Sequence, residues 1–216
     1  EIRLSLVGSE MCIRDSNIFA RLGTGALPFL TPLLLQLGMG YSPAQAGMSM
    51  IPLALAAMAM KPLAKPLIDR LGYRRILTFN TVLLGLLITS LALVDGQTSH
   101  LQLAIQLSLI GAFNSLQFTA MNTVTLIDVP DSDASSGNGL LSVVVQLSIS
   151  MGIATGAALL SGFSLDNQTA ADSVLSAFQS TYLCIGLLTI LAAGIFLQLA
   201  PEDARSARRV KVDVDE

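Results

Sequence analysis

The chain has 216 residues, of which 52% are hydrophobic and 12% are charged, and its formal net charge at pH 7 is −3. Soluble domains usually carry about 25% charged residues, so this composition indicates a membrane protein. No basic face with interleaved aromatic residues suggests nucleic-acid binding. The single histidine, His100, has no partner at metal-ligand spacing, and Cys184 lies in an apolar run, so neither a metal site nor a disulfide with Cys12 is expected.

The first 16 residues, EIRLSLVGSEMCIRDS, differ from everything that follows. They begin without Met and have no continuous apolar core, so they are neither a signal peptide nor a spanning helix. The stretch EMCIRDS matches the transposon end sequence used in DNA-library preparation when that sequence is read through as protein. We therefore expect residues 1–16 to be foreign and the natural sequence to begin at or near Asn17, with an upstream part missing; the alternative is a native cytoplasmic lead-in.

Six apolar runs follow, each close to the roughly 17–25 residues that a helix needs to cross a hydrocarbon layer. Inside lipid every backbone polar group must be bonded within its own segment, so these runs predict helices. They cover residues 18–39, 44–61, 76–94, 101–124, 138–163 and 180–200. The predicted fold is an all-α membrane protein, a six-helix transmembrane bundle over residues 17–200, followed by a cytoplasmic tail over residues 201–216.

In the first run, Arg21 precedes the apolar body, and Pro28 and Pro32 are expected to bend the helix. Two interpretations of Arg21 stay open: its side chain reaches the cytoplasmic interface, or it faces a central cavity as a charge partner. Residues 42–45, with the sequence SPAQ, predict a capping box with proline at the first helical position, so the second helix should begin there.

Between the second and third runs, the sequence KPLAKPLIDRLGYRRI concentrates five basic residues, and no Lys or Arg follows until Arg205. Basic residues stay on the cytoplasmic side of a membrane. The loops at 40–46, 95–100 and 164–178 contain none, so both ends of the chain should be cytoplasmic. Gly72 can take the positive φ of a tight reversal, and helix dipoles favour an acid near a helix N-terminus and cations near a C-terminus. The segment is therefore either a topology anchor alone or a loop that braces one helix against another.

Two polar stripes occur inside the runs. In the fourth run the stripe comprises Gln102, Gln106, Phe113 and Gln117, with Asn114 beside it, and in the fifth it comprises Asn138, Ser142 and Gln146. Such a stripe either lines an aqueous cavity or hydrogen-bonds a neighbouring helix, and the sequence leaves both interpretations open. The candidate cavity-lining residues are Arg21, Gln102, Gln106, Asn114, Gln117, Asn138 and Gln146.

Small residues at helical spacing predict close helix packing. They are Ser108, Gly111 and Ser115 in the fourth run, and Ser148, Gly152 and Gly156 in the fifth. No Asp or Glu lies within any of the six runs, although a proton-coupled pump usually needs a carboxylate at membrane depth. No nucleophile–base pair, phosphate loop or metal-ligand spacing indicates an enzyme.

The basic segment resembles the cytoplasmic loop G-x-x-x-D-R-x-G-R-R of the major facilitator superfamily. The matching residues are Asp69, Arg70, Gly72, Arg74 and Arg75, while Lys65 replaces the leading glycine and Tyr73 interrupts the basic run. The segments ARLGTGALPFLTPLLLQLGMGYSPAQAG and FTAMNTVTLIDVPDSDASSGNGLLSVVVQLSISMG resemble the fourteen-helix drug:proton antiporter branch, the EmrB/QacA type, and most nearly its MdtD-like members. The resemblance covers residues 17–200, and the degenerate loop resembles the second copy found in the C-terminal half of these transporters.

The resemblance implies the C-terminal half of a transporter in the bacterial inner membrane, which exports amphipathic drugs or small molecules by alternating access. It implies the proton as coupling ion, with no other cofactor, and a proton-carrying acid in the N-terminal half. The expected partners are the lipid bilayer, a small-molecule substrate and the missing N-terminal half. A small-metabolite uptake facilitator and a stand-alone six-helix scaffold or receptor remain alternatives.

Overall fold

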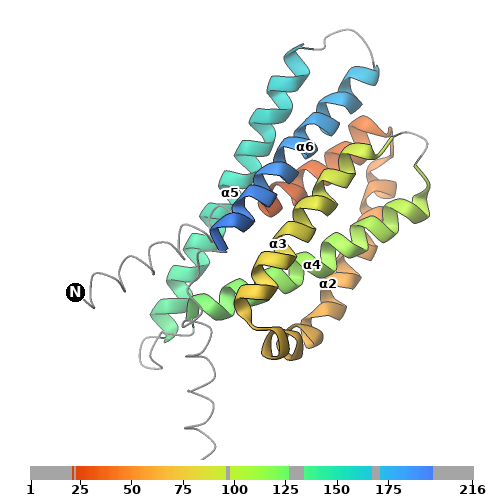
Figure 1. Ribbon diagram of the computed structural model, residues 1–216. Coiled ribbons are helices and arrows are strands. Elements are labelled where there is room, and N and C mark those ends of the chain that lie inside the picture. Colours follow the sequence, from red (N-terminus) through yellow and green to blue (C-terminus); the bar gives the residue numbers. More distant parts are fainter. Residues whose placement is uncertain (1–20, 22, 96–97, 127–133, 167–170, 197–216) are drawn as a thin grey trace, which may run out of the picture.

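The computed structural model describes residues 21, 23–95, 98–126, 134–166 and 171–196, and these residues are almost entirely helical (Figure 1). The first helix continues from residues 23–33 into a π-helical turn, η1 (Leu34–Gly38). It is followed by α2 (Pro43–Leu71), α3 (Tyr73–Ser90) with the short 3₁₀ turn η2 (Leu91–Leu93), α4 (His100–Leu126), α5 (Ala134–Asp166) and α6 (Ala171–Phe196). Among the described residues there is no strand, and the predicted all-α, six-helix membrane bundle is confirmed.

Five helices are long and apolar enough to cross a membrane: Pro43–Leu71, Tyr73–Leu93, His100–Val124, Ser135–Ser164 and Val174–Gly194. The remaining expected span, residues 18–39, is helical at residue 21 and from residue 23 to residue 38. The predicted segments 1–16 and 201–216 lie outside the described residues, and their assignments stay predictions.

The predicted end of the second helix is wrong, because α2 continues past residue 61 to Leu71. The apolar run ends at residue 61, whereas the backbone hydrogen bonding continues through a basic, proline-containing stretch with Pro62 and Pro66 inside the helix. Hydropathy marks where a helix leaves the apolar layer, and nothing requires the helix to end there. The α6 helix differs in the same way, since it begins at Ala171 rather than at residue 180.

The predicted start of α2 is confirmed. The Ser42 N–H donates to Oε1 of Gln45 at 2.9 Å, and the Gln45 N–H donates to Oγ of Ser42 at 3.3 Å. Pro43 occupies the first helical position, where its missing N–H leaves no unsatisfied bond.

Gly72 alone separates α2 from α3, with φ of +82°, in the region where only glycine is unstrained. Its N–H donates to the Ile68 carbonyl at 2.9 Å and closes α2. The predicted loop is therefore a single residue between two helices. Asp69 and Arg70 lie in the last turn of α2, and Arg74 lies in the first turn of α3.

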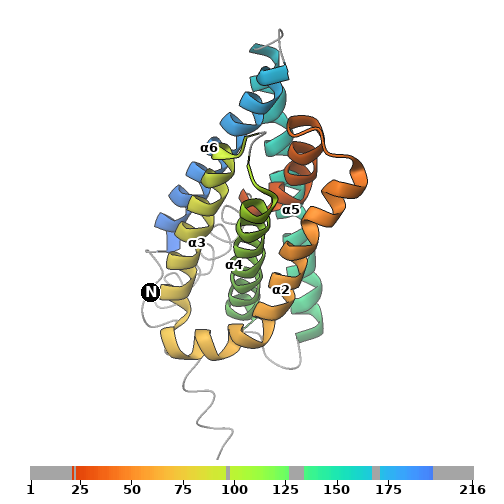
Figure 2. The same cartoon turned by 90° about the vertical axis from the view of Figure 1, so that its right-hand side faces the viewer.

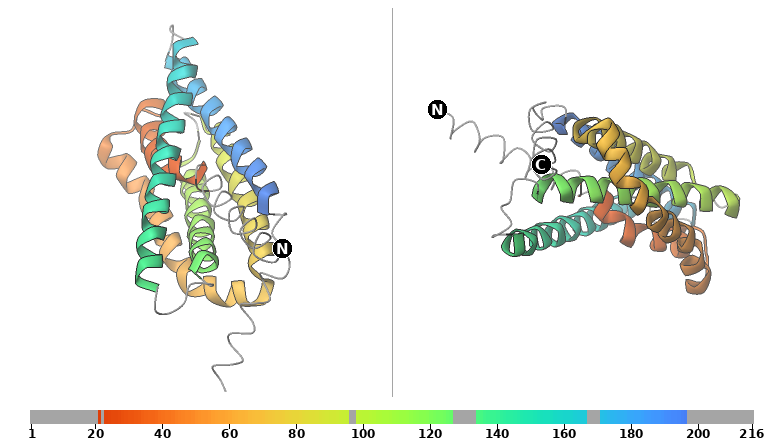
Figure 3. Two further views of the ribbon diagram at one scale, coloured as in Figure 1. Left: turned by 90° about the vertical axis from the view of Figure 1, so that its left-hand side faces the viewer. Right: turned by 90° about the horizontal axis from the view of Figure 1, so that it is seen from below.

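The helices pack as neighbouring pairs. The α4 helix lies between α2 and α3 (Figure 2), α3 packs along α6, and α5 runs along the other side of the bundle (Figure 3). The largest buried cluster joins the first helix to α6 and to the end of α3, around Leu30, Leu91 and Tyr182. A second cluster packs the end of α2 and the start of α3 against α4, around Ala64, Ile76 and Leu116.

Two helices are far more exposed than the others. Within the most apolar stretch of each helix, 11% of the residues of α2 and 17% of those of α5 are buried, against 39–44% for α3, α4 and α6. Their exposed side chains include Met48, Leu55 and Met58 on α2 and Val143 and Leu147 on α5. The bundle thus leaves one long face of each of these two helices uncovered.

Candidate functional site

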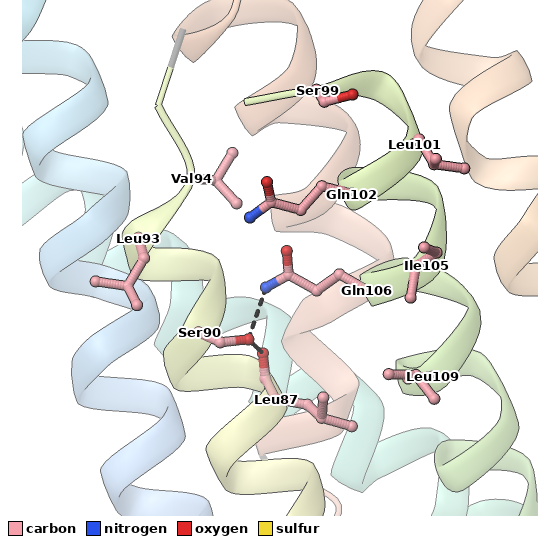
Figure 4. Close-up of a pocket in the computed structure, with 10 residues that line it drawn as sticks. All are labelled: Leu87, Ser90, Leu93, Val94, Ser99, Leu101, Gln102, Ile105, Gln106 and Leu109. Atoms are coloured by element: carbon pink, nitrogen blue, oxygen red, sulfur yellow. Dashed lines mark hydrogen bonds between the residues drawn. The ribbon is translucent and has the colours of Figure 1, made fainter. Parts of the chain in front are cut away.

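The polar side chains predicted along α4 are divided among three environments. Gln102 and Gln106, near the His100 end, extend from α4 toward α3 (Figure 4). Gln117 is buried between α4 and α3, and Asn114 lies half-buried on another face. One predicted stripe therefore serves different purposes along its length.

Gln102 and Gln106 line a pocket of about 520 Å³ between the His100 end of α4 and the facing end of α3. The Gln106 Nε2 donates to Oγ of Ser90 at 2.6 Å, and the Ser90 hydroxyl donates to the Leu87 carbonyl at 2.7 Å. The pocket volume falls in the range of about 300–1,000 Å³ typical of small-molecule sites. Its lining consists of Leu87, Ser90, Leu93, Val94, Ser99, Leu101, Gln102, Ile105, Gln106 and Leu109.

The chemistry of this pocket suits an uncharged or weakly polar ligand. Its lining combines leucine, isoleucine and valine side chains with two amides and two hydroxyls, and none of the ten side chains is charged. Leu101 and Ile105 are 70% and 54% exposed, so the apolar part of the pocket is open to its surroundings. Such a surface can hold an apolar body while the amides bond a single polar group.

Gln117 hydrogen-bonds a neighbouring helix, which is one of the two interpretations that the sequence left open. Its side chain is 3% exposed, its Oε1 accepts from Nδ2 of Asn80 at 2.7 Å, and its Nε2 donates to Oγ1 of Thr81 at 2.7 Å. Gln117 thus bonds α4 to α3. Sequence reasoning missed Asn80, because a single asparagine in an apolar run has no periodic partner to mark it.

Arg21 packs against α4. Its side chain is 5% exposed, its Nη2 donates to Oδ1 of Asn122 at 2.6 Å, and its guanidinium carbon lies 4.7 Å from the centroid of the Phe118 ring. A guanidinium over an aromatic face is attracted by the ring electrons. These contacts join the beginning of the first helix to the end of α4 that is distant from His100.

Phe118 and Asn122, which contact Arg21, were also missed from the sequence, although a signal was present. Asn114, Phe118 and Asn122 recur every four residues, which puts them on one face of α4. Phe118 is 44% exposed, and Asn114 and Asn122 are half-buried. The Phe118 ring and the two amides form an amphipathic surface on α4, and the buried Arg21 guanidinium contacts the ring.

On α5, Asn138 and Gln146 are exposed on the uncovered side of the bundle. Ser142, between them, donates its hydroxyl to the Asn138 carbonyl at 2.8 Å, within its own helix. Exposed amides are costly against lipid, so this surface calls for water or another protein segment.

Three of the predicted small residues, Gly111, Ser148 and Gly156, lie where helices come close. A Cβ at Gly111 would lie 2.9 Å from the backbone carbon of Leu53 in α2, and a Cβ at Gly156 would lie 3.1 Å from Cβ of Ala26 in the first helix. Ser148 and Gly152 are buried, whereas Ser108 and Ser115 are half-buried. A Cβ at Gly25 would lie 3.0 Å from Cα of Ile149, next to Ser148, so the first helix and α5 approach each other closely.

A further close approach was missed, between α3 and α6. A Cβ at Gly85 would lie 3.0 Å from the Gly186 carbonyl oxygen, and a Cβ at Gly186 would lie 2.9 Å from the Gly85 carbonyl oxygen. Thr89, one turn beyond Gly85, completes a small-residue spacing of four that the sequence does contain.

The charges around Gly72 oppose the dipole arrangement expected from the sequence. Asp69 lies at the C-terminal end of α2, while Arg74 and Arg75 lie at the N-terminal end of α3. Each such placement is unfavourable by about 0.3–1 kcal/mol when exposed. Arg70, in the last turn of α2, is favourably placed. Asp69 and Arg75 are exposed and Arg74 is half-buried, and the helix dipole does not account for these three residues at their positions.

Comparison with known proteins identifies the family. The sequence matches the Major Facilitator Superfamily over residues 16–213, which is most of the chain. The chain belongs to this superfamily. Proteins of the superfamily are transporters rather than enzymes, and the resemblance carried by the α2–α3 junction is thereby confirmed.

The chain is also similar to individual superfamily members. It is 42% identical over 201 residues to the putative multidrug resistance protein MdtD of Yersinia pestis (strain Pestoides F) and to that of Yersinia pseudotuberculosis serotype O:1b (strain IP 31758). The alignment covers 92% of this chain and 41% of each relative. The chain thus spans about two fifths of the length of these relatives, and it is a multi-pass membrane protein of this transporter superfamily.

Proposed function

We propose that this chain is the C-terminal six-helix half of a secondary active transporter that exports amphipathic drugs or small molecules from bacteria. Export proceeds by alternating access and is driven by proton influx across the inner membrane. The observation that carries the proposal is the pair of uncovered helices, α2 and α5, in a chain that spans 41% of its transporter relatives. A second six-helix unit packed on these two helices would complete a cavity.

The polar residues on the uncovered side support this assignment. Asn138 and Gln146 of α5 are exposed, and an amide at membrane depth is costly unless water or protein bonds it. Asn114, Phe118 and Asn122 supply amides and an aromatic ring on α4. Together with Arg21, these residues are our candidates for contact with an amphipathic substrate.

The tight contacts of the bundle support movement of the half as a unit. Alternating access requires one repeat to rock against the other around a site near the midplane. Close contacts at Gly111, Gly156 and Gly85, of which those at Gly111 and Gly85 involve backbone atoms, leave little room for helices to slide within this half. We therefore infer that the larger movement occurs at the exposed faces of α2 and α5.

The proton-carrying acid is proposed to lie elsewhere in the intact protein. The six apolar runs of this chain contain no Asp or Glu, whereas a carboxylate that titrates at membrane depth is the usual carrier. A long-read sequence of the source DNA upstream of the Asn17 codon tests this directly. An open frame with further spanning segments and an acid at membrane depth is expected; a start codon within a few codons of Asn17 would favour a stand-alone six-helix module.

We propose an orientation with the α2–α3 junction and both ends of the chain in the cytoplasm, because the basic residues concentrate there. Single cysteines at Arg75 and at Ser99, in a chain with Cys12 and Cys184 replaced, test it. A membrane-impermeant maleimide applied to spheroplasts should label the Ser99→Cys variant only. Labelling of the Arg75→Cys variant alone would indicate the opposite orientation and contradict the proposal.

The proposed bracing role of Asp69 is tested by charge reversal in the intact transporter. Because Asp69 lies at a helix C-terminus, the dipole favours lysine there, so Asp69→Lys should insert and accumulate normally. We expect efflux to fall at least tenfold, and Asp69→Glu to keep most of it. Normal efflux by a well-expressed Asp69→Lys variant would contradict the bracing role.

A further inference from the structure

The hydrogen bonds between α3 and α4 form a chain with a single direction. Asn80 donates from Nδ2 to the Phe113 carbonyl at 2.9 Å and to Oε1 of Gln117 at 2.7 Å. Gln117 then donates from Nε2 to Oγ1 of Thr81 at 2.7 Å, and the Thr81 hydroxyl donates to the Leu77 carbonyl at 2.6 Å.

Both ends of this chain are backbone carbonyls, and a carbonyl can only accept. The Phe113 carbonyl therefore requires the amide nitrogen of Asn80, rather than its oxygen, to face it. The Leu77 carbonyl requires the Thr81 hydroxyl to donate, so that Thr81 must accept from the Gln117 nitrogen. The orientation of both side-chain amides is thus determined, although amide orientation is often ambiguous.

With both amides in this orientation, one acceptor atom is left without a hydrogen-bond donor. Both N–H groups of Asn80 are used, and within the described part of the chain its Oδ1 has no hydrogen-bond partner. Asn80 is 2% exposed, Gln117 is 3% exposed and Thr81 is 1% exposed, so bulk solvent does not reach this oxygen. A buried acceptor without a partner is unfavourable by about 1–3 kcal/mol.

We propose that the α3–α4 interface holds a buried water molecule, bound by donation to Oδ1 of Asn80. Buried waters typically bond polar groups that the protein leaves unsatisfied, and they make about three hydrogen bonds. Helix carbonyls have a second lone pair, so the carbonyls along this stretch of α3 and α4 can accept the other proton of the water. The site is a small hydration site in the wall between two helices, separate from the pocket near His100.

Radiolytic hydroxyl-radical labelling tests this site, because X-rays generate radicals from bound water at its own position. The 216-residue chain in lipid nanodiscs is irradiated with X-rays for microseconds, and the oxidised residues are mapped by mass spectrometry. Leu77, Leu84 and Leu116 flank the amide chain and are 1–3% exposed; Leu103 and Leu107 of α4 are 0–2% exposed and lie away from it. The proposal predicts at least fivefold more oxidation of the first set than of the second, and equal oxidation of the two sets would overturn it.

Substitution ties the labelling to Asn80. Asn80→Leu should lower the oxidation of the flanking leucines to the level of the other two, whereas Asn114→Leu, the same change on α4 and outside the amide chain, should leave it unchanged. If Asn80→Leu does not fold, Asn80→Val serves, because its smaller side chain also has no hydrogen-bond acceptor. Oxidation that persists in a folded Asn80 variant would overturn the assignment of the water to Oδ1.

Discussion

Replacement of Gly111 by alanine should destabilise the contact between α2 and α4. The added Cβ would lie 2.9 Å from the backbone carbon of Leu53 and 3.0 Å from its Cα, and it would come closer still to the Leu53 carbonyl oxygen. Backbone atoms cannot rotate away as a side chain can, so the two helices must separate. Overpacking of this kind costs about 1–3 kcal/mol.

Alanine also favours a helix over glycine by about 1 kcal/mol, which offsets part of this effect. We therefore expect Gly111→Ala to lower the free energy of unfolding by up to about 2 kcal/mol. The matched control is Gly139→Ala in α5, where an added Cβ would meet nothing within 4 Å. That variant should be unchanged or more stable by up to about 1 kcal/mol.

The assay is reversible unfolding of the chain in bicelles, with the two variants compared under identical lipid and detergent conditions. A Gly111→Ala variant as stable as Gly139→Ala would refute the reasoning, because it would mean that α2 and α4 do not approach as closely as the structure has them.

Three further predictions concern other contacts. Gln117→Leu should lower the unfolding free energy by about 1–3 kcal/mol in the same assay, because it removes two hydrogen bonds and leaves a donor of Asn80 buried; an unchanged value would exclude a stabilising role for the amide chain. Ser42→Ala should cost about 0.5–2 kcal/mol locally and speed hydrogen exchange at the Gln45 amide, and unaltered exchange would contradict the capping box. Arg21→Lys keeps the charge but loses the planar stacking, so efflux by the intact transporter should fall several-fold; full activity would show that charge alone suffices.

Hydropathy predicted the helices far better than their ends. The thickness of the hydrocarbon layer sets the length and apolar composition of a spanning helix, and both can be read directly from a single sequence. Local chemistry predicted the Ser42 cap and the positive φ of Gly72 equally well, because each depends on a few neighbouring residues. The extension of α2 to Leu71 was missed, since a helix can continue beyond the apolar layer in charged residues.

The candidate site was predicted only in part, because periodicity shows that residues share a face without showing what the face meets. Gln102 and Gln117 belong to one stripe, yet the first lines a pocket and the second is buried against α3. The partner helix supplied residues that no pattern marked, above all Asn80. Arg21 was recognised, and spacing puts Phe118 on one face of α4, but the contact between the two residues follows from tertiary packing.

The most direct test of the half-transporter proposal is energised efflux of a lipophilic cationic dye from cells that lack their own exporters. One strain produces this chain alone and the other produces the intact protein restored from its gene, at matched membrane levels. We predict that the intact protein exports the dye, that a protonophore abolishes export, and that the chain alone exports none. Export by the chain alone, or no export of any tested amphipathic compound by the intact protein, would contradict the proposal.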